Sequence, residues 1–361
     1  MLSISAWLCA CWIGPCCCGW RFCCREAGCL LEHGGRLRLA ARAGGIALEH
    51  WLDLSTGLNP NGWPVPMPPE DVWRRLPESD DGLPAAATAY YGTPHLLAVS
   101  GSQAAIQSLP ALRPAGRIGL VTPTYAEHGA AWRAAGHQVL PLHPADIDDA
   151  LAALDVLLLV HPNNPTGLCY PTEQLRAWHH KLARRGGWLV LDEAFMDATP
   201  EHSLISECGE AGLIVLRSVG KFFGLAGIRL GFVAAWPALL ATLEQRLGPW
   251  AVAHPARWAG SLALADQGWQ AAMRQDLPQA GTRLAKLLTS VGLPPAGGTA
   301  LFQYVQTADA ATWQRALQQQ AVLVRLFAEP AALRFGLPGS EVEWQRLAAA
   351  LRAVQPAVNA L

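Results

Sequence analysis

The sequence lacks net charge and long apolar runs, and both absences narrow the class of protein. Lys and Arg number 27 against 28 Asp and Glu, which leaves a formal charge of −1, and the arginines are spread along the chain. Nucleic-acid-binding surfaces normally show a basic stripe, so we expect no nucleic-acid partner. No apolar run reaches the length of a membrane span, so we expect no membrane partner either. With 361 residues and 51% hydrophobic content, the chain can bury a large core and should be a soluble metabolic protein.

Cysteine is nearly missing from most of the chain. Only Cys169 and Cys208 lie beyond residue 30, whereas the remaining cysteines precede it: Cys9, Cys11, Cys16, Cys17, Cys18, Cys23, Cys24 and Cys29. A secreted disulfide-bonded protein would spread its cysteines through the fold, so the body indicates a reducing compartment, the cytoplasm. Cys-rich tracts can bind zinc, but this one lacks regular CxxC pairing, and no basic residue precedes its apolar stretch as in a signal peptide. We expect residues 1–30 to be disordered or outside the native fold, with the biological chain starting near His33.

A lysine framed by small residues is the most informative feature that the sequence does contain. Lys221 lies in the segment SVGKFFGLAGIRLGF (218–232), with Ser218 three residues before it and Arg229 eight after it. A lysine that forms a Schiff base must be reachable and close to a phosphate-bearing cofactor. The glycines allow close backbone approach, and Ser218 and Arg229 offer donors to a phosphate. A lone SxxK is more often a solvated lysine in a turn, so the assignment depends on other segments.

Two further segments place polar side chains at the ends of predicted strands. The apolar run 156–160 precedes HPNNPTG (161–167), and the run 188–191 precedes DEAF (192–195); both runs are typical of buried strands. Ligands of α/β sheets bind at the carboxyl ends of the strands. Asp192 is therefore placed to pair with a protonated pyridine nitrogen, which keeps such a cofactor an electron sink. An Asp after a strand is ordinarily a helix N-cap. The presence of Lys221 and Asn164 favours the cofactor-binding role for Asp192 instead.

The motifs NNPTG (163–167), DEAF (192–195) and SxxKxxGLAGxRLG (218–231) together resemble fold-type I pyridoxal-phosphate enzymes, the class I/II aminotransferase group. The resemblance extends from about His33 to the C-terminus. It implies an α/β fold with a large domain, a mostly parallel sheet between helices, and a smaller α+β domain. It also implies pyridoxal 5'-phosphate as cofactor and a homodimer with its active site at the subunit interface.

Other segments resemble one branch of this group, the threonine-phosphate decarboxylases of cobalamin biosynthesis. These segments are LEHGG (31–35), WLDLSTGLNPNG (51–62), PWAV (249–252) and ALADQGWQ (263–270). The implied reaction is decarboxylation of L-threonine O-3-phosphate to (R)-1-amino-2-propanol O-2-phosphate. The alternative is an aminotransferase of the histidinol-phosphate type, which shares the core motifs. A non-catalytic regulatory protein is a third interpretation, against which the Schiff-base lysine argues.

The order of predicted elements supports a division into four parts. These are the Cys-rich residues 1–30, an N-terminal segment with a proline-rich active-site loop (31–69), a large cofactor-binding domain (70–250) and a small C-terminal domain (251–361). Predicted strands at 97–100 and 118–121 and helices entered at 101–106 alternate through about residue 235. Beyond Pro249 we expect helices at 259–264, 280–291 and 342–354 and short strands at 301–305 and 332–336. Five prolines and two glycines between residues 55 and 69 exclude regular structure there.

The resemblance assigns a role to each candidate site residue. Lys221 carries the cofactor and Asp192 pairs with its ring nitrogen, while Asn164 donates to the ring 3-oxygen and Tyr125 stacks on the ring. The cofactor phosphate lies at the start of a helix, where free backbone N–H groups favour anions; the residues that hold it are Gly101, Ser102, Gln103, Ser218 and Arg229. No metal is expected at this site.

Substrate recognition needs further groups. Arg334, within the apolar segment 331–335, is expected to hold the substrate carboxylate as a bidentate pair, because an unpaired charge in a strand is costly. The resemblance also places His33 and Asn59 near the substrate, with Arg325 as an outside candidate for its phosphate.

Two residues depart from the pattern of the group. Phe195 replaces a tyrosine whose hydroxyl reaches the 3-oxygen, which is compatible with the decarboxylase interpretation. Leu76 stands where relatives carry a tyrosine that reaches the neighbouring subunit's cofactor phosphate, and Tyr90 or Tyr91 is a candidate replacement.

Overall fold

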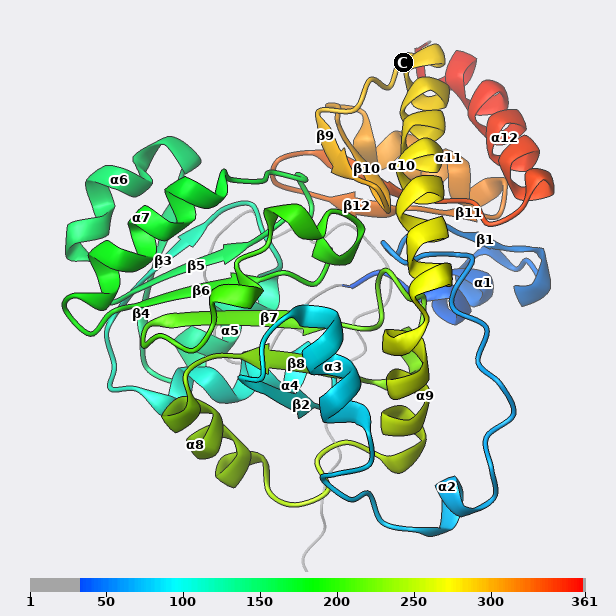
Figure 1. Cartoon of the computed structure of the whole chain (residues 1–361). Helices are drawn as coiled ribbons and strands as arrows, with labels where there is room; N and C mark the ends of the chain where they lie inside the picture. The colour runs from blue at the N-terminus through cyan, green and yellow to red at the C-terminus, as the bar shows by residue number, and fades with distance from the viewer. Residues whose placement is uncertain (1–32, 360–361) are drawn as a thin grey trace, which may run out of the picture. The chain divides into compact units, whose positions relative to one another are not determined.

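The computed structural model describes residues 33–359, so the predictions for residues 1–30 fall outside the described part of the chain. A seven-stranded sheet forms its larger half, in the order β2-β8-β7-β6-β5-β3-β4 (Figure 1). Strands β3 to β7 run parallel, and β8 is antiparallel to both of its neighbours. The mostly parallel sheet predicted from the sequence is confirmed. Its strands are β2 (Leu96–Val99), β3 (Arg117–Val121), β4 (Gln138–Leu142), β5 (Val156–Val160), β6 (Trp188–Asp192), β7 (Leu213–Ser218) and β8 (Gly231–Ala234).

Helices cover both faces of this sheet because side chains alternate along each strand. Leu157 and Leu159 of β5 belong to one apolar cluster, and Val156 and Leu158 belong to the other. The first cluster includes side chains of α3 (Leu83–Tyr91), α7 (Thr172–Ala183) and α9 (His254–Ala265). The second includes side chains of α4 (Ser102–Ser108), α5 (Ala126–Ala134) and α8 (Pro237–Leu247). The fully apolar strands β5 and β6 are thus buried on both sides.

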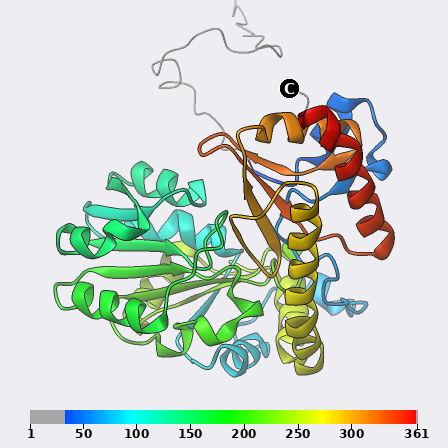
Figure 2. The same cartoon turned by 90° about the horizontal axis from the view of Figure 1, so that it is seen from above.

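A second, antiparallel sheet lies in the C-terminal part of the chain, in the order β12-β13-β10-β9. The predicted strands at 301–305 and 332–336 are β10 (Phe302–Gln306) and β13 (Ala332–Gly336); β9 (Gly297–Thr299) and β12 (Arg325–Phe327) were not predicted. Its helices are α10 (Gln267–Ser290), α11 (Ala310–Gln319) and α12 (Glu341–Asn359). Figure 2 shows this sheet and its helices beside the larger sheet.

The N-terminal segment joins the C-terminal part through a two-stranded parallel sheet. Strand β1 (Leu52–Asp53) pairs with β11 (Val322–Leu323), and Trp51 packs against Ala321 and Leu323. Between β1 and α2 (Asp71–Arg74) no helix or strand forms, as the prolines predict. The remaining helices are α1 (Leu37–Gly44) and α6 (Ile147–Ala150), with single 3-10 turns η1 (Leu48–His50), η2 (Leu109–Leu112), η3 (Pro144–Asp146), η4 (Leu151–Ala153), η5 (Met196–Ala198), η6 (Pro200–His202), η7 (Ile205–Glu207) and η8 (Ala226–Ile228).

The NNPTG loop (163–167) after β5 meets strand β9 of the second sheet backbone to backbone. A Cβ atom added to Gly167 would lie 2.1 Å from the carbonyl oxygen of Gly298, and one added to Gly297 would lie 2.1 Å from that of Thr166. Gly167 also has φ +76°, which other residues rarely adopt. The NNPTG loop therefore fits against β9 only with glycine at these places.

No helix among residues 33–359 combines the length and the apolar character that crossing a membrane requires.

Candidate active site

A cavity of about 360 Å³ opens where β5, β6 and β7 end. Val160, Asp192 and Ser218, the last residues of these strands, all line it, as expected for a parallel sheet. Its volume lies in the range of small-ligand sites. The predicted site residues that line the cavity are His33, Ser102, Gln103, Tyr125, Asn164, Asp192, Ser218, Lys221 and Arg229; Gly101, Asn59 and Arg334 do not line it.

Lys221 projects into this cavity from the turn after β7. Its pKa falls from 10.5 to about 8 because burial disfavours the charged ammonium and because the Arg334 charge repels it. Its Nζ lies 5.4 Å from the centroid of the Phe195 ring. A lysine with this pKa is partly neutral near physiological pH, and the neutral amine is the form that attacks a carbonyl.

Asp192 is held by a histidine that the sequence analysis missed. His128 in α5 donates a hydrogen bond from Nε2 to Oδ2 of Asp192 over 2.8 Å, and both side chains are buried. The other carboxylate oxygen accepts the backbone N–H of Ala194 over 3.1 Å. His128 lies one helical turn beyond Tyr125, a spacing that brings both to one face of α5. This spacing could have pointed to His128, but only if the position of α5 on the sheet had been known.

The start of α4 and the guanidinium of Arg229 form the opposite end of the cavity. Gly101 has φ +70°, and a Cβ atom there would lie 2.7 Å from Nη2 of Arg229. Gly101 therefore does not line the cavity but makes room for the arginine. Ser102, Ser218 and Arg229 then present hydroxyl and guanidinium donors to one region, a donor set suited to a phosphate.

Glu127, also missed from the sequence, connects the polar residues at another wall of the cavity. Its carboxylate accepts hydrogen bonds from His33 Nε2 over 2.7 Å and from Gln103 Nε2 over 3.0 Å. The Tyr125 hydroxyl donates to Oε1 of Gln103 over 3.2 Å. Burial, together with the nearby Glu127 charge, raises the pKa of Tyr125 to about 12, so this phenol stays protonated.

Arg334 lies behind the cavity lining and contacts Asn164. Its Nη1 donates to Oδ1 of Asn164 over 2.5 Å, and its Nη2 donates to the Ser55 carbonyl over 2.8 Å. Its Nε is buried without a hydrogen-bond partner among the described residues. Burial, and then the charge of Arg325, lowers the pKa of Arg334 to about 10. The guanidinium thus remains charged at neutral pH and keeps donors to spare.

Asn59 uses its side chain within the loop rather than in the cavity. Its Nδ2 donates to the Phe222 carbonyl over 2.9 Å, and its backbone N–H donates to the Lys221 carbonyl over 3.0 Å. Trp63 continues this contact by donating its backbone N–H to Phe223 over 2.8 Å. These hydrogen bonds fasten the proline-rich loop to the turn that carries Lys221. Asn59 therefore holds the backbone of this turn in place.

A buried ionic network lies directly next to these site residues. Arg217 precedes Ser218 in β7, and its guanidinium lies 3.5 Å from Glu193 and 3.6 Å from Asp197. The Tyr90 hydroxyl donates to Asp197 over 3.1 Å and accepts from Arg274 over 3.1 Å. Burial raises the pKa of Glu193 to about 7, an effect that the Arg217 charge opposes.

The two tyrosines that the sequence offers in place of the one that Leu76 displaces have intrachain surroundings. The Tyr90 hydroxyl donates to Asp197, and Tyr91 is only 3% exposed. Leu76, by contrast, is 62% exposed. The role of either tyrosine toward a neighbouring subunit stays a prediction.

Comparison with known proteins places the fold and the family. The family model described as "Aminotransferase class I and II" matches residues 67–351. A threonine-phosphate decarboxylase of Pseudomonas aeruginosa is 53% identical over 324 residues, which cover 89% of this chain and 97% of that protein. Another from Sinorhizobium is 40% identical and covers 89% and 97% respectively.

The fold recurs in solved structures of lower sequence similarity. The crystal structure of a histidinol-phosphate aminotransferase from Sinorhizobium meliloti, in complex with pyridoxal-5'-phosphate, superimposes with a TM-score of 0.78 at 22% identity, covering 91% of this chain and 96% of that one. At this identity the likeness concerns the fold alone. From the family match over residues 67–351 and the two long alignments, the chain belongs to the class I and II aminotransferase family.

Proposed function

We propose that this protein is a pyridoxal-phosphate-dependent decarboxylase of L-threonine O-3-phosphate, which releases carbon dioxide and forms (R)-1-amino-2-propanol O-2-phosphate for cobalamin biosynthesis. The observation that carries the proposal is the cavity in which Lys221, Asp192 and Arg229 converge. The choice of substrate is supported by the relatives at 53% and 40% identity. We also propose a cytoplasmic location, since both cysteines of the described residues are free thiols.

The donor set of the cavity fits this cofactor. Arg229, Ser102 and Ser218 supply donors for its phosphate at one end, and Asp192 supplies an acceptor for a protonated ring nitrogen. Lys221 lies in the same cavity with a lowered pKa. The bound cofactor supplies an electron sink that accepts the electrons of the breaking Cα–carboxylate bond.

Each protein group then has a defined task. Asp192, which His128 holds from behind, would accept a hydrogen bond from the protonated ring nitrogen. Asn164, which Arg334 orients, would donate through its side-chain amide to the ring 3-oxygen. Lys221 would hold the cofactor through its amine, and this amine or a water molecule would return a proton to Cα of the substrate.

Substrate binding falls to Arg334, behind the cavity lining, and to His33 at the cavity wall. The spare donors of Arg334 suit the substrate carboxylate, and His33, held by Glu127, lies where a second anionic group can be received. Phe195 replaces the family's tyrosine at the cavity wall and contributes only an apolar surface to the region of Lys221.

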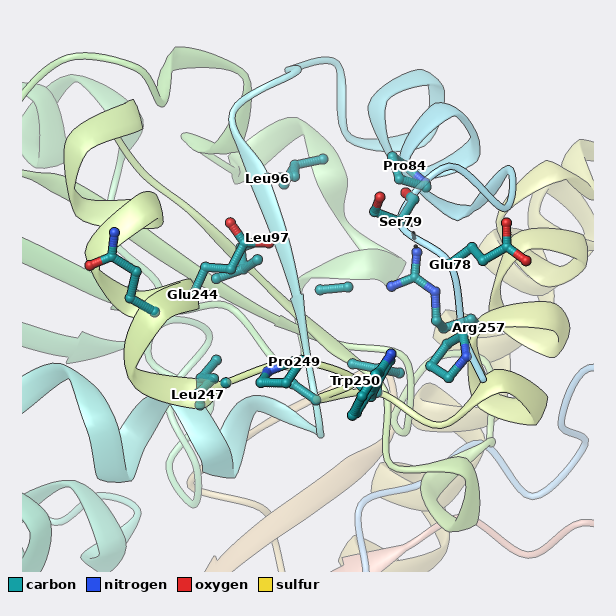
Figure 3. A pocket seen from close by; sticks show the side chains of 16 residues that line it. Glu78, Ser79, Pro84, Leu96, Leu97, Glu244, Leu247, Pro249, Trp250 and Arg257 are labelled. Carbon is teal, nitrogen blue, oxygen red and sulfur yellow. Dashed lines mark hydrogen bonds between the residues drawn. The ribbon is translucent and has the colours of Figure 1, made fainter. Parts of the chain in front are cut away.

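We also propose a homodimer formed through exposed apolar side chains of residues 65–76 and 250. These side chains are Val65, Met67, Trp73, Leu76 and Trp250, of which Met67 is 91% exposed. Trp250, Ser79 and Arg257 line a cavity of about 670 Å³, and Figure 3 shows their side chains. Large exposed apolar patches mark protein–protein contact sites. A Trp250→Arg/Leu76→Arg variant should be monomeric in light scattering, and an unchanged dimer would place the interface elsewhere.

The test of the reaction is carbon dioxide release from L-threonine O-3-phosphate by protein supplied with pyridoxal phosphate. Release without any 2-oxo acid is expected, and Lys221→Ala should abolish it. Lys181→Ala is the matched control, because Lys181 is a surface lysine paired with Asp148 over 3.5 Å. No release, but amino transfer from histidinol phosphate to 2-oxoglutarate, would assign the protein to the alternative function.

A further inference from the structure

Three side chains with metal-binding atoms come together far from the cavity. His179 and His180 lie in the last turns of α7, and Glu210 lies in the loop before β7. One ligand atom from each residue lies within 4.8 Å of the other two. No other trio of His, Cys, Asp or Glu within residues 33–359 meets this criterion.

The three side chains differ in how firmly they are held. His179 is buried, and its Nε2 lies 3.2 Å from the Ala211 carbonyl oxygen. A proton donated to that carbonyl leaves the lone pair on Nδ1, and such backbone contacts commonly orient metal-binding histidines. His180 and Glu210 are exposed, and no side-chain hydrogen bond or ion pair engages either of them in the described part of the chain. One ligand is therefore anchored and two are free to adjust.

This set of atoms suits a zinc ion. Two imidazoles and one carboxylate, with water as the fourth ligand, form a usual zinc environment. Three atoms no more than 4.8 Å apart lie at most about 2.8 Å from a common centre, and zinc bonds measure roughly 2.0–2.2 Å. Rotation of the two exposed side chains can close this difference.

The local charges also favour a cation. The carbonyl end of a helix carries partial negative charge, and α7 ends at Ala183. Two neighbouring cations are compensated, since Arg176 pairs with Glu207 over 2.7 Å and Lys181 pairs with Asp148 over 3.5 Å. Arg184, one turn beyond His180, is exposed to solvent, which screens its charge.

We propose that His179, His180 and Glu210 bind one Zn²⁺ ion. The site links α7 to the loop before β7 and lies near the amino end of that strand, whereas the catalytic cavity lies at its carboxyl end. It is independent of the proposed reaction. The sequence predicted no metal here because the two histidines and Glu210 are separated by 30 residues with no recognisable ligand spacing.

The test is calorimetric titration of the full-length, metal-stripped protein with zinc chloride. His180→Ala should bind one equivalent less than wild type, or bind that equivalent at least tenfold more weakly, and Glu210→Gln should behave alike. His50→Ala, which removes another exposed histidine, is the matched control and should bind as wild type does. The difference between variants excludes zinc bound by the N-terminal cysteines, which all of these proteins share.

A second readout separates binding from damage to the fold. Zinc should raise the melting temperature of wild type and His50→Ala but not that of His180→Ala, because a ligand of the native state stabilises it. Cofactor absorbance should be equal in all three. Equal zinc stoichiometry and affinity in wild type and His180→Ala would overturn the proposal.

Discussion

Replacing Arg217 by Met should destabilise this protein more than any single surface change. Its guanidinium is only 2% exposed and lies between two carboxylates that are fully buried, Glu193 at 3.5 Å and Asp197 at 3.6 Å. Methionine replaces the aliphatic stem of arginine but removes the guanidinium and its positive charge. Breaking a buried ion pair by deleting one partner typically costs about 3–5 kcal/mol, because the remaining charge stays uncompensated.

The pH dependence follows from the carboxylates. In the wild type the pKa of Glu193 is raised to about 7, so the folded state holds a proton that the unfolded state releases near 4.5, and stability falls between these values as pH rises. Without Arg217 the folded pKa values of Glu193 and Asp197 should rise further. The loss of stability in Arg217→Met should therefore be larger at pH 8 than at pH 6.

Urea unfolding followed by tryptophan fluorescence measures this cost, and two further variants make it decisive. Arg176→Met breaks an exposed pair with Glu207 at 2.7 Å and should cost far less, because solvent screens surface ion pairs. Arg217→Met/Glu193→Gln removes one stranded charge and should recover part of the stability. If Arg217→Met costs no more than Arg176→Met, the interior tolerates these charges and the reasoning is wrong.

Three other changes test the cavity. Cofactor-free Lys221→Met should be more stable than wild type at pH 7 in urea unfolding. This difference in stability should disappear between pH 8 and 10.5, because the folded wild type, with a Lys221 pKa of about 8, has lost a proton there that the unfolded chain still binds. A difference that is independent of pH would contradict this. Arg334→Ala should weaken substrate binding by roughly 2–4 kcal/mol in titration calorimetry, as for loss of a desolvated bidentate contact, and unchanged affinity would remove Arg334 from the substrate site. Gly101→Ala should lower the affinity for pyridoxal phosphate, measured by quenching of protein fluorescence, because the added Cβ would lie 2.7 Å from Arg229; equal affinity would show that the arginine can move aside.

The strands with unbroken apolar runs could be predicted from the sequence, and the short ones could not. The runs at 156–160 and 188–191 match β5 and β6 to within one residue, because strands covered on both faces carry no polar positions. Strand β9 has the sequence Gly-Gly-Thr, and β1 and β11 have two residues each. Strands β1 and β11 form by pairing with each other although they are far apart in the sequence, and β9 forms by pairing with the following strand β10.

The candidate site shows the same division. Residues within a motif, such as Asn164 and Lys221, could be located because the motif fixes their place at a strand end. His128 and Glu127 became visible only when α5 was placed over the sheet, since their partners Asp192 and His33 lie 64 and 94 residues away. Asn59, which the resemblance places near the substrate, donates its side chain to the Phe222 backbone, a contact that composition and spacing do not reveal. The substrate roles of His33, Asn59 and Arg334 remain predictions.

The hydrogen bond from Arg334 to Ser55 has a consequence for the growing chain on the ribosome. These residues are separated by 279 positions. Strand β1 likewise cannot pair until β11 has been synthesised. At a synthesis rate of roughly 5–20 residues per second, the early segment spends about 14–56 s without its partner. The same segment is fastened through Asn59 to the turn that carries Lys221. This turn is synthesised before β11 and Arg334, the C-terminal partners of the segment. Cofactor capture should therefore be a late event of synthesis, completed only when the last strands leave the exit tunnel.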